Sequence, residues 1–368
     1  MTTSVLKRPS AAEARPRRRG PGVRGRDGIA GWLFTAPVLI ILGLFLVLPI
    51  LMAAWVSVSS WNGLGSPFQD TVKFVGGDNY AALLAKPGLA QTDFGTSLRN
   101  NGWYVLLVVP IQTAVSLFLA ILVNQRVLAA RSAFRTAFYF PSVTSSVAIT
   151  VIFLFLFSAS GTVNAIVQWL GGSGVGWFAD TRGVVQQALG AFGVHAPSGS
   201  GFLGLTWFDW ISGPSPAMLV FVVMAIFTTS GTFMLIYLAA LQQIARDIEE
   251  ATIMDGANAW QRFRYVTLPM LRPTTFTVMT LGLIGTWQIF DQIYVGSKGG
   301  PAKTTLTPAF LSYSQSFINN AWGRGAAIAF ILFAIIVVFT LVQRVLLAER
   351  GSARKAPRRR PGGRRAHG

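Results

Sequence analysis

The sequence contains 368 residues, of which 52% are hydrophobic and only 12% are charged; soluble domains carry about twice that charged fraction, so a soluble protein is disfavoured. It has no cysteine, which excludes disulfides and thiolate metal sites. The net charge of +18 raises the question of nucleic-acid binding, and the answer depends on where the basic residues lie.

More than half of the basic residues lie in two tails. Eight of the 31 Lys and Arg fall within residues 1–30, and nine fall from Arg344 onward. Both segments are rich in Arg, Pro and Gly, so we predict disordered tails at 1–30 and 348–368. Such tails can contact phosphates. We instead expect solvated anchors on the cytoplasmic face beside anionic lipid, which leaves nothing for a nucleic-acid partner to explain.

Apolar runs between the tails indicate an all-α membrane protein with a transmembrane domain at 31–347. About 20 apolar residues cross the hydrocarbon core, and residues 32–55 carry no charge. The predicted spans, in chain order, are 31–56, 100–123, 137–158, 216–241, 273–294 and 325–347. The fifth is the least regular, because Gln288, Asp291 and Gln292 crowd its end.

The distribution of basic residues predicts the orientation of these six spans. With both termini in the cytoplasm, the inside segments collect 24 Lys and Arg and the outside loops hold the other seven of the 31. Cytoplasmic loops of membrane proteins carry such an excess. We therefore expect 57–99, 159–215 and 295–324 outside, and the loop between spans four and five inside.

That cytoplasmic loop reads LQQIARDIEEATIMDGANAWQRFRYVTLP and predicts a helix-turn-helix on the membrane surface. Asp247, Glu249 and Glu250 come early, where negative charge suits a helix dipole. Gly256 permits a backbone angle at which one helix can stop and a second begin. We expect Leu268-Pro269 and Arg272-Pro273 to end the second helix and to start span five. The alternative is a surface helix that only closes the loop.

A long motif in this loop carries a family resemblance. Glu250-Ala251-Thr252 is followed after three residues by Gly256, and after nine more by Val266-x-Leu268-Pro269. This resembles the EAA loop of binding-protein-dependent ABC importer permeases, EAA-x3-G-x9-I-x-LP, with Thr in place of the second Ala and Val in place of Ile. FVGGDNYAALL, FRTAFYFPSV, MLIYLAALQQI and DQIYVGSKGGPAKTT are similar to the carbohydrate-uptake branch, and the last looks most like the first permease subunit of the maltose and glycerol-phosphate systems.

The resemblance implies a multi-pass permease of the bacterial plasma (inner) membrane that translocates a sugar or related small polar solute. It implies a heterodimer with a second permease subunit, a dimer of ATP-binding subunits that hold ATP and Mg, and an extracytoplasmic solute-binding protein. This chain would hold no cofactor and would not hydrolyse ATP. The resemblance places the ATPase contact at Glu249, Glu250, Ala251, Asp255, Gly256, Ala257, Leu268 and Pro269.

Enzyme chemistry finds no support in the residues. The segment GSKGGPAKTT lacks the Gly that a phosphate loop needs before Lys303. The histidines, His195 and His367, stand in a loop and a tail, so we expect no metal site and no catalytic constellation. The alternative function is a secondary, ion-coupled transporter, which usually has more spans and inverted repeats.

Polar residues within the predicted spans are the candidates for the substrate path, because burial in lipid is costly for them. Gln112 and Gln288 can hydrogen-bond sugar hydroxyls, and Asp291 is expected near the outer rim. Hydrogen bonds between helices are the alternative role for each.

Overall fold

The computed structural model describes residues 26–125, 130–193, 199 and 201–347. Every regular element in these residues is helical, and the only strand-like feature is an isolated bridge between Ser59 and Phe74. The tails predicted at 1–30 and 348–368 lie outside the described residues, except that 26–30 form the start of the first helix. The all-α prediction is therefore confirmed over the described part of the chain.

The chain divides into two compact units, at 1–53 and 54–368. In the first, α1 (Arg26–Leu42), the π-turn η1 (Gly43–Val47) and the start of α2 (Leu48–Ser57) follow one another directly. They belong to a 30-residue apolar helix, Gly28–Ser57. The helix predicted at 31–56 is present and is long enough to span a membrane.

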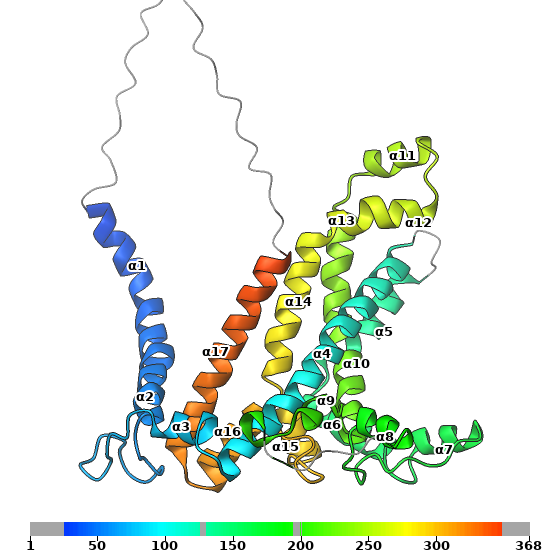
Figure 1. The fold of residues 1–368 in the computed structure, drawn as a ribbon. Helices are drawn as coiled ribbons and strands as arrows, with labels where there is room; N and C mark the ends of the chain where they lie inside the picture. The colour runs from blue at the N-terminus through cyan, green and yellow to red at the C-terminus, as the bar shows by residue number, and fades with distance from the viewer. Residues whose placement is uncertain (1–25, 126–129, 194–198, 200, 348–368) are drawn as a thin grey trace, which may run out of the picture. The chain divides into compact units, whose positions relative to one another are not determined.

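The second unit holds the remaining helices (Figure 1). In chain order they are α3 (Asp78–Leu84), α4 (Leu89–Asn124), α5 (Arg131–Val143), α6 (Ser146–Leu156), α7 (Thr162–Trp169), α8 (Val184–Ala191), η2 (Phe202–Gly204), α9 (Trp207–Ile211), α10 (Pro216–Gln242), α11 (Arg246–Met254), α12 (Ala259–Arg262), η3 (Phe263–Thr267), α13 (Leu268–Met270), α14 (Arg272–Trp287), α15 (Asp291–Gly296), α16 (Pro308–Tyr313), η4 (Ser314–Ile318) and α17 (Trp322–Leu347).

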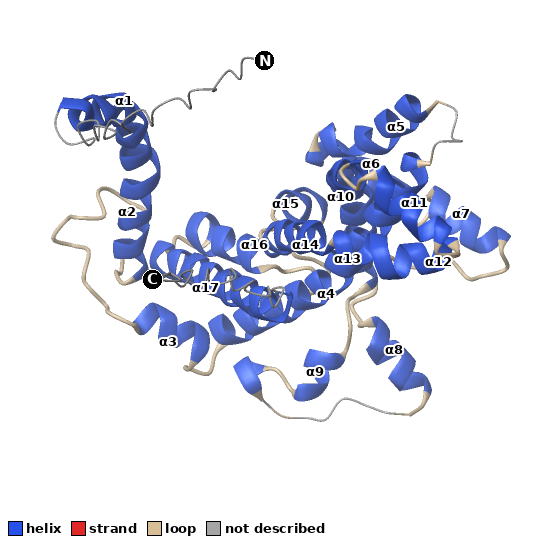
Figure 2. Ribbon diagram, turned by 90° about the horizontal axis from the view of Figure 1, so that it is seen from above, coloured by secondary structure: helices blue, strands red, loops and turns tan. Residues whose placement is uncertain are grey.

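Long helices of the second unit run side by side, and the short ones gather at their ends (Figures 1 and 2). One buried cluster joins α4, α10 and α14 through Val123, Tyr237 and Val278. Another joins α4, α14 and α17 through Val109, Leu283 and Leu332. Large apolar side chains also cover the outer faces of these helices, as expected where lipid is the solvent.

The third predicted span, 137–158, is broken. Its place is taken by α5 and α6, which meet at an angle of 95° across Thr144 and Ser145. Four helices of the described residues are long and apolar enough to cross a membrane, and the bent pair brings the number to as many as five.

Two other predicted spans differ in length from the observed helices. The second, predicted at 100–123, begins at Leu89, since α4 continues beyond the apolar run. The fifth, predicted at 273–294, ends at Trp287. The buried amide of Asn101 donates to the carbonyl of Trp287, so a side chain from α4 satisfies a carbonyl group at the end of α14. The spans predicted at 216–241 and 325–347 match α10 and α17 to within three residues.

Candidate functional site

The predicted helix-turn-helix is present as α11 and α12, at the end of the unit opposite to α7, α8 and α16 (Figure 1). Gly256 lies between them with a φ of +75°. The Gly256 N–H donates to the carbonyl of Ile253 and the Ala257 N–H donates to that of Thr252, which is a Schellman motif. Asn258 and Gln261 then cap α12 reciprocally, each backbone N–H donating to the other's side chain at 2.8 Å. The turn at Gly256 is therefore fixed by hydrogen bonds at both ends.

The first helix of this element is exposed. None of the α11 side chains is buried, and Met254 has 87% of its surface open. Glu249, Glu250 and Ala251 share this exposure, as do Asp255 and Gly256 just beyond the helix. Exposed apolar and acidic groups on one short, capped helix form a surface that a partner protein can grip.

The second helix was expected to end at Leu268-Pro269 and Arg272-Pro273, and it runs past the first of these steps. It continues through the π-turn η3 and α13 to Met270, and α14 begins at Arg272, the second step. The Leu268 N–H reaches back five residues to the carbonyl of Phe263, because Pro269 has no N–H and its ring displaces the carbonyl of the preceding turn. The same π-turn precedes Leu48-Pro49 in the first unit. Ala257, Leu268 and Pro269 are half-buried, in contrast to the exposed residues of α11.

A cavity of about 330 Å³ is lined by all three sequence-predicted substrate-path residues, Gln112, Gln288 and Asp291. They come from α4, from the residue after α14 and from the start of α15, so distant parts of the sequence meet here. A volume near 300 Å³ with several polar groups in the wall is typical of small-molecule sites. Asp291 does not continue the fifth span, since it begins a separate helix.

Gln112 is fully buried in the wall of this cavity. Its Oε1 lies 2.7 Å from the hydroxyl of Thr229 on α10. Its Nε2 has no hydrogen-bond partner among the described residues and packs against Gly282 of α14. A buried amide donor without a partner is uncommon, and this one marks the crossing of α4, α10 and α14.

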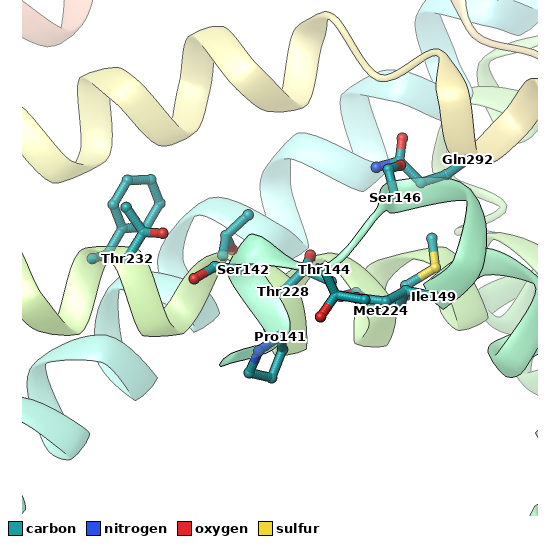
Figure 3. A pocket seen from close by; sticks show the side chains of 11 residues that line it. Pro141, Ser142, Thr144, Ser146, Ile149, Met224, Thr228, Thr232 and Gln292 are labelled. Carbon is teal, nitrogen blue, oxygen red and sulfur yellow. Dashed lines mark hydrogen bonds between the residues drawn. The ribbon is translucent and has the colours of Figure 1, made fainter. Parts of the chain in front are cut away.

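An adjoining cavity of about 300 Å³ shares Thr228, Thr229, Phe233 and Gln292 with the first. Figure 3 shows its wall, where Ser142, Thr144 and Ser146 from the bend between α5 and α6 face Thr228 and Gln292. The Ser146 hydroxyl is buried and has no partner in the described part of the chain. The bend therefore adds hydroxyl groups to a polar lining.

These hydroxyl residues were not found from the sequence. Ser and Thr in an apolar helix usually donate to their own backbone, as Thr228 does to the carbonyl of Met224. Only the pairing Thr228-Thr229 and the Pro141-Ser142 step offered a signal.

Aromatic rings extend from the cavity along the outer helices. Phe290 lines the cavity, and its ring centroid lies 5.3 Å from that of Tyr313. Tyr294 lies 5.2 Å from Tyr313, and Phe317 follows at 5.0 Å. Rings at such separations attract one another and offer flat apolar faces.

The segment that partly resembles a phosphate loop serves a structural role. Its Lys303 pairs with Asp93 at 2.6 Å, and Asn100 donates both amide hydrogens to the carbonyls of Lys303 and Leu306. Among the described residues no group of His, Asp and Glu could hold a metal ion. His195 and His367 lie outside those residues.

Residues 112–349 match the family described as "Binding-protein-dependent transport system inner membrane component". The lactose transport system permease protein of Rhizobium radiobacter is 29% identical over 325 residues, 88% of this chain and 95% of that protein. The arabinooligosaccharides transport system permease protein of Halalkalibacterium halodurans is 33% identical over 278 residues, 75% of this chain and 76% of that protein.

A solved structure shares the fold. A bacterial ABC transporter involved in the import of the acidic polysaccharide alginate has a chain with a TM-score of 0.64 and 18% identity, covering 88% of this chain and 96% of its own. A second structure of a bacterial alginate ABC transporter, in complex with an alginate pentasaccharide-bound periplasmic protein, gives a TM-score of 0.65. At 18% identity the likeness concerns the fold alone.

Proposed function

Since the chain belongs to the family of binding-protein-dependent transport system inner membrane components, we propose that it passes a sugar or related small polar solute through the membrane. The observation that carries the proposal is the family match over residues 112–349, which includes the exposed helix α11 and every residue that lines the polar cavity except Tyr104. Relatives named for lactose and arabinooligosaccharides support the substrate class. The family membership removes the secondary transporter as an alternative.

We propose six spans with both termini in the cytoplasm. They are the helix Gly28–Ser57, α4, the bent pair α5–α6, α10, α14 and α17. The 16 residues of α14 give a rise of about 24 Å, which is short for a span, and α13 extends the same path. With this orientation the cytoplasmic segments hold 24 Lys and Arg and the outer loops hold seven, which favours it. The same orientation makes α11 and α12 cytoplasmic.

The ATPase contact is proposed at α11 and the turn after it. An exposed helix that leads through α12, η3 and α13 into α14 can transmit a displacement to a membrane span. ATP and Mg would be held by the ATP-binding subunits, and Glu250 would offer its carboxylate to a basic residue there. Closure of the ATPase pair would bias the permease between inward-open and outward-open states.

The substrate path is proposed through the two adjoining cavities. Gln112, Gln288 and Asp291 supply amide and carboxylate groups for sugar hydroxyls, and the hydroxyls from the α5–α6 bend extend the same surface. The rings of Phe290 and Tyr313 supply faces for the apolar side of a sugar ring. A solute-binding protein would release its sugar at the extracytoplasmic end of this path. A second permease subunit would complete the wall of the path.

The experiment is purification of the assembled importer with its binding protein, mass spectrometric identification of the bound solute, and uptake into vesicles. We expect a saccharide, and uptake that requires ATP and persists when the proton gradient is collapsed. A non-carbohydrate solute would overturn the substrate class, and uptake without ATP would overturn the transport mechanism.

A further inference from the structure

A third cavity, of about 730 Å³, lies where α11 and α12 join the ends of α4, α5 and α10. Its wall shares no residue with the two substrate cavities. The charged side chains in the wall are Arg131, Arg246, Arg262 and Glu249. It is therefore a separate, strongly polar site at the base of the helix-turn-helix formed by α11 and α12, which we call the coupling element.

The charges in this wall do not balance. Three guanidinium groups and one carboxylate line the cavity, which leaves an excess of two positive charges. None of the four forms an ion pair within the described residues, whose ion pairs are Lys86–Asp78, Arg182–Asp180 and Lys303–Asp93. One turn along α5 from Arg131, the Nε of Arg135 is buried and has no hydrogen-bond partner. Guanidinium donors are in excess here and call for an anion.

The position of the cavity identifies the source of the anion. Asn124 and Gln242, the last residues of the long apolar helices α4 and α10, contribute to the wall. In the orientation proposed above, on which this inference rests, these ends lie at the level of the cytoplasmic headgroups. Basic pockets between membrane helices on that side suit acidic lipid headgroups.

We propose that this cavity binds the phosphate group of an anionic phospholipid of the cytoplasmic leaflet. A guanidinium fork matches two phosphate oxygens, and the cavity has room for a headgroup beyond the phosphate itself. Because Arg131 belongs to α5, Arg246 to α11 and Arg262 to α12, one phosphate joins the helix bundle to both halves of the coupling element. Anionic lipid then steadies the helix that receives the ATPase.

The test is native mass spectrometry of the full purified chain with phosphatidylglycerol and with phosphatidylcholine of the same acyl chains. We expect preferential retention of phosphatidylglycerol, which falls about fivefold in Arg131→Gln and in Arg262→Gln, since a basic residue near the surface contributes about 1 kcal/mol. Glu249→Gln should raise retention, an opposite sign that loss of folding cannot produce. Arg182→Gln, in an exposed loop of the opposite end, should leave it unchanged.

Unchanged retention in the double variant Arg131→Gln/Arg262→Gln would overturn the proposal. In the second arm of the experiment, inorganic phosphate is added to the protein with its bound lipid. Displacement of the bound lipid by millimolar phosphate, with equal retention of both lipids, would show that a free anion occupies the site and would also overturn it. The assay uses neither ATPase nor sugar, so its failure is distinct from failure of the transport function.

Discussion

Gln112 of α4 and Gly282 of α14 are in direct contact, with the amide nitrogen of Gln112 where a side chain at position 282 would begin. The contact lies in the wall of the proposed substrate cavity. The absence of a side chain at position 282 allows α4 and α14 to approach closely at this point.

Substitution Gly282→Ala should therefore destabilise the protein by about 1–3 kcal/mol, because the new methyl group displaces a fully buried amide from its hydrogen bond with Thr229. Thermal unfolding in detergent measures the change. Gly285→Ala is the matched control, since a methyl group there meets nothing within 4 Å.

The double variant Gln112→Ala/Gly282→Ala tests the cause. Truncating Gln112 removes the overlap, so the double variant should unfold at a higher temperature than additivity predicts. Additive losses would show that the contact does not couple the two helices.

Substitution Gly256→Asn should preserve the coupling element, whereas Gly256→Val should disrupt it. The φ of +75° is the left-handed region, which Asn tolerates and a β-branched residue does not, at a difference of about 1–2 kcal/mol. Space is not the obstacle, because nothing lies within 4 Å of the position. Co-purification of the ATP-binding subunit is the readout, and equal co-purification by both variants would refute the backbone argument.

The sequence predicted this element well because its signals are local. The acidic residues at the helix start and the glycine at the turn lie within about ten residues of one another. The effect of Pro269 was predicted wrongly. A proline has no backbone N–H, and this can either end a helix or be accommodated by a π-turn through which the helix continues, as it is here. Nothing in the sequence distinguishes a helix that ends at such a proline from one that continues through a π-turn.

The cavity could be predicted only in part, because long-range contacts build it. Gln112, Gln288 and Asp291 were chosen as polar residues in apolar runs, and they line one cavity. At the early end of α14 the Trp287 carbonyl accepts a hydrogen bond from Asn101, 186 residues away in the sequence, and no local pattern reveals this contact. The α5–α6 bend has only Pro141 as a local sign, and that proline lies inside α5 rather than at the break.

Substitution Asn100→Leu should destabilise the outer end of the protein by about 2–3 kcal/mol. Asn100 is almost fully buried and donates to the carbonyls of Lys303 and Leu306, which would both lose their partner. Thermal unfolding measures the loss. Asn62→Ala serves as the control, because its hydrogen bond to the Leu64 N–H is exposed. A change below about 0.5 kcal/mol for Asn100→Leu would contradict the role of these bonds.

Substitutions Gln288→Ala and Asp291→Asn should weaken import of the sugar about two- to tenfold each, the effect of one lost hydrogen bond. The loss should appear as a higher half-saturating sugar concentration for uptake by proteoliposomes. Thr277→Ala in α14 is the control, since that exposed hydroxyl donates to its own backbone. Uptake unchanged in both cavity variants would remove them from the path.

The central claim is that α11 lies in the cytoplasm and is held by the ATPase, and the absence of native cysteine permits a direct measurement. Ile253→Cys places a single thiol on the exposed helix, and Trp169→Cys places one on the exposed surface of α7 at the opposite end. A membrane-impermeant thiol reagent should label position 253 only in inverted vesicles, more slowly when the ATP-binding subunits are present, and position 169 only in intact spheroplasts. Labelling of position 253 from outside, or at the same rate with and without the ATPase, would contradict the account.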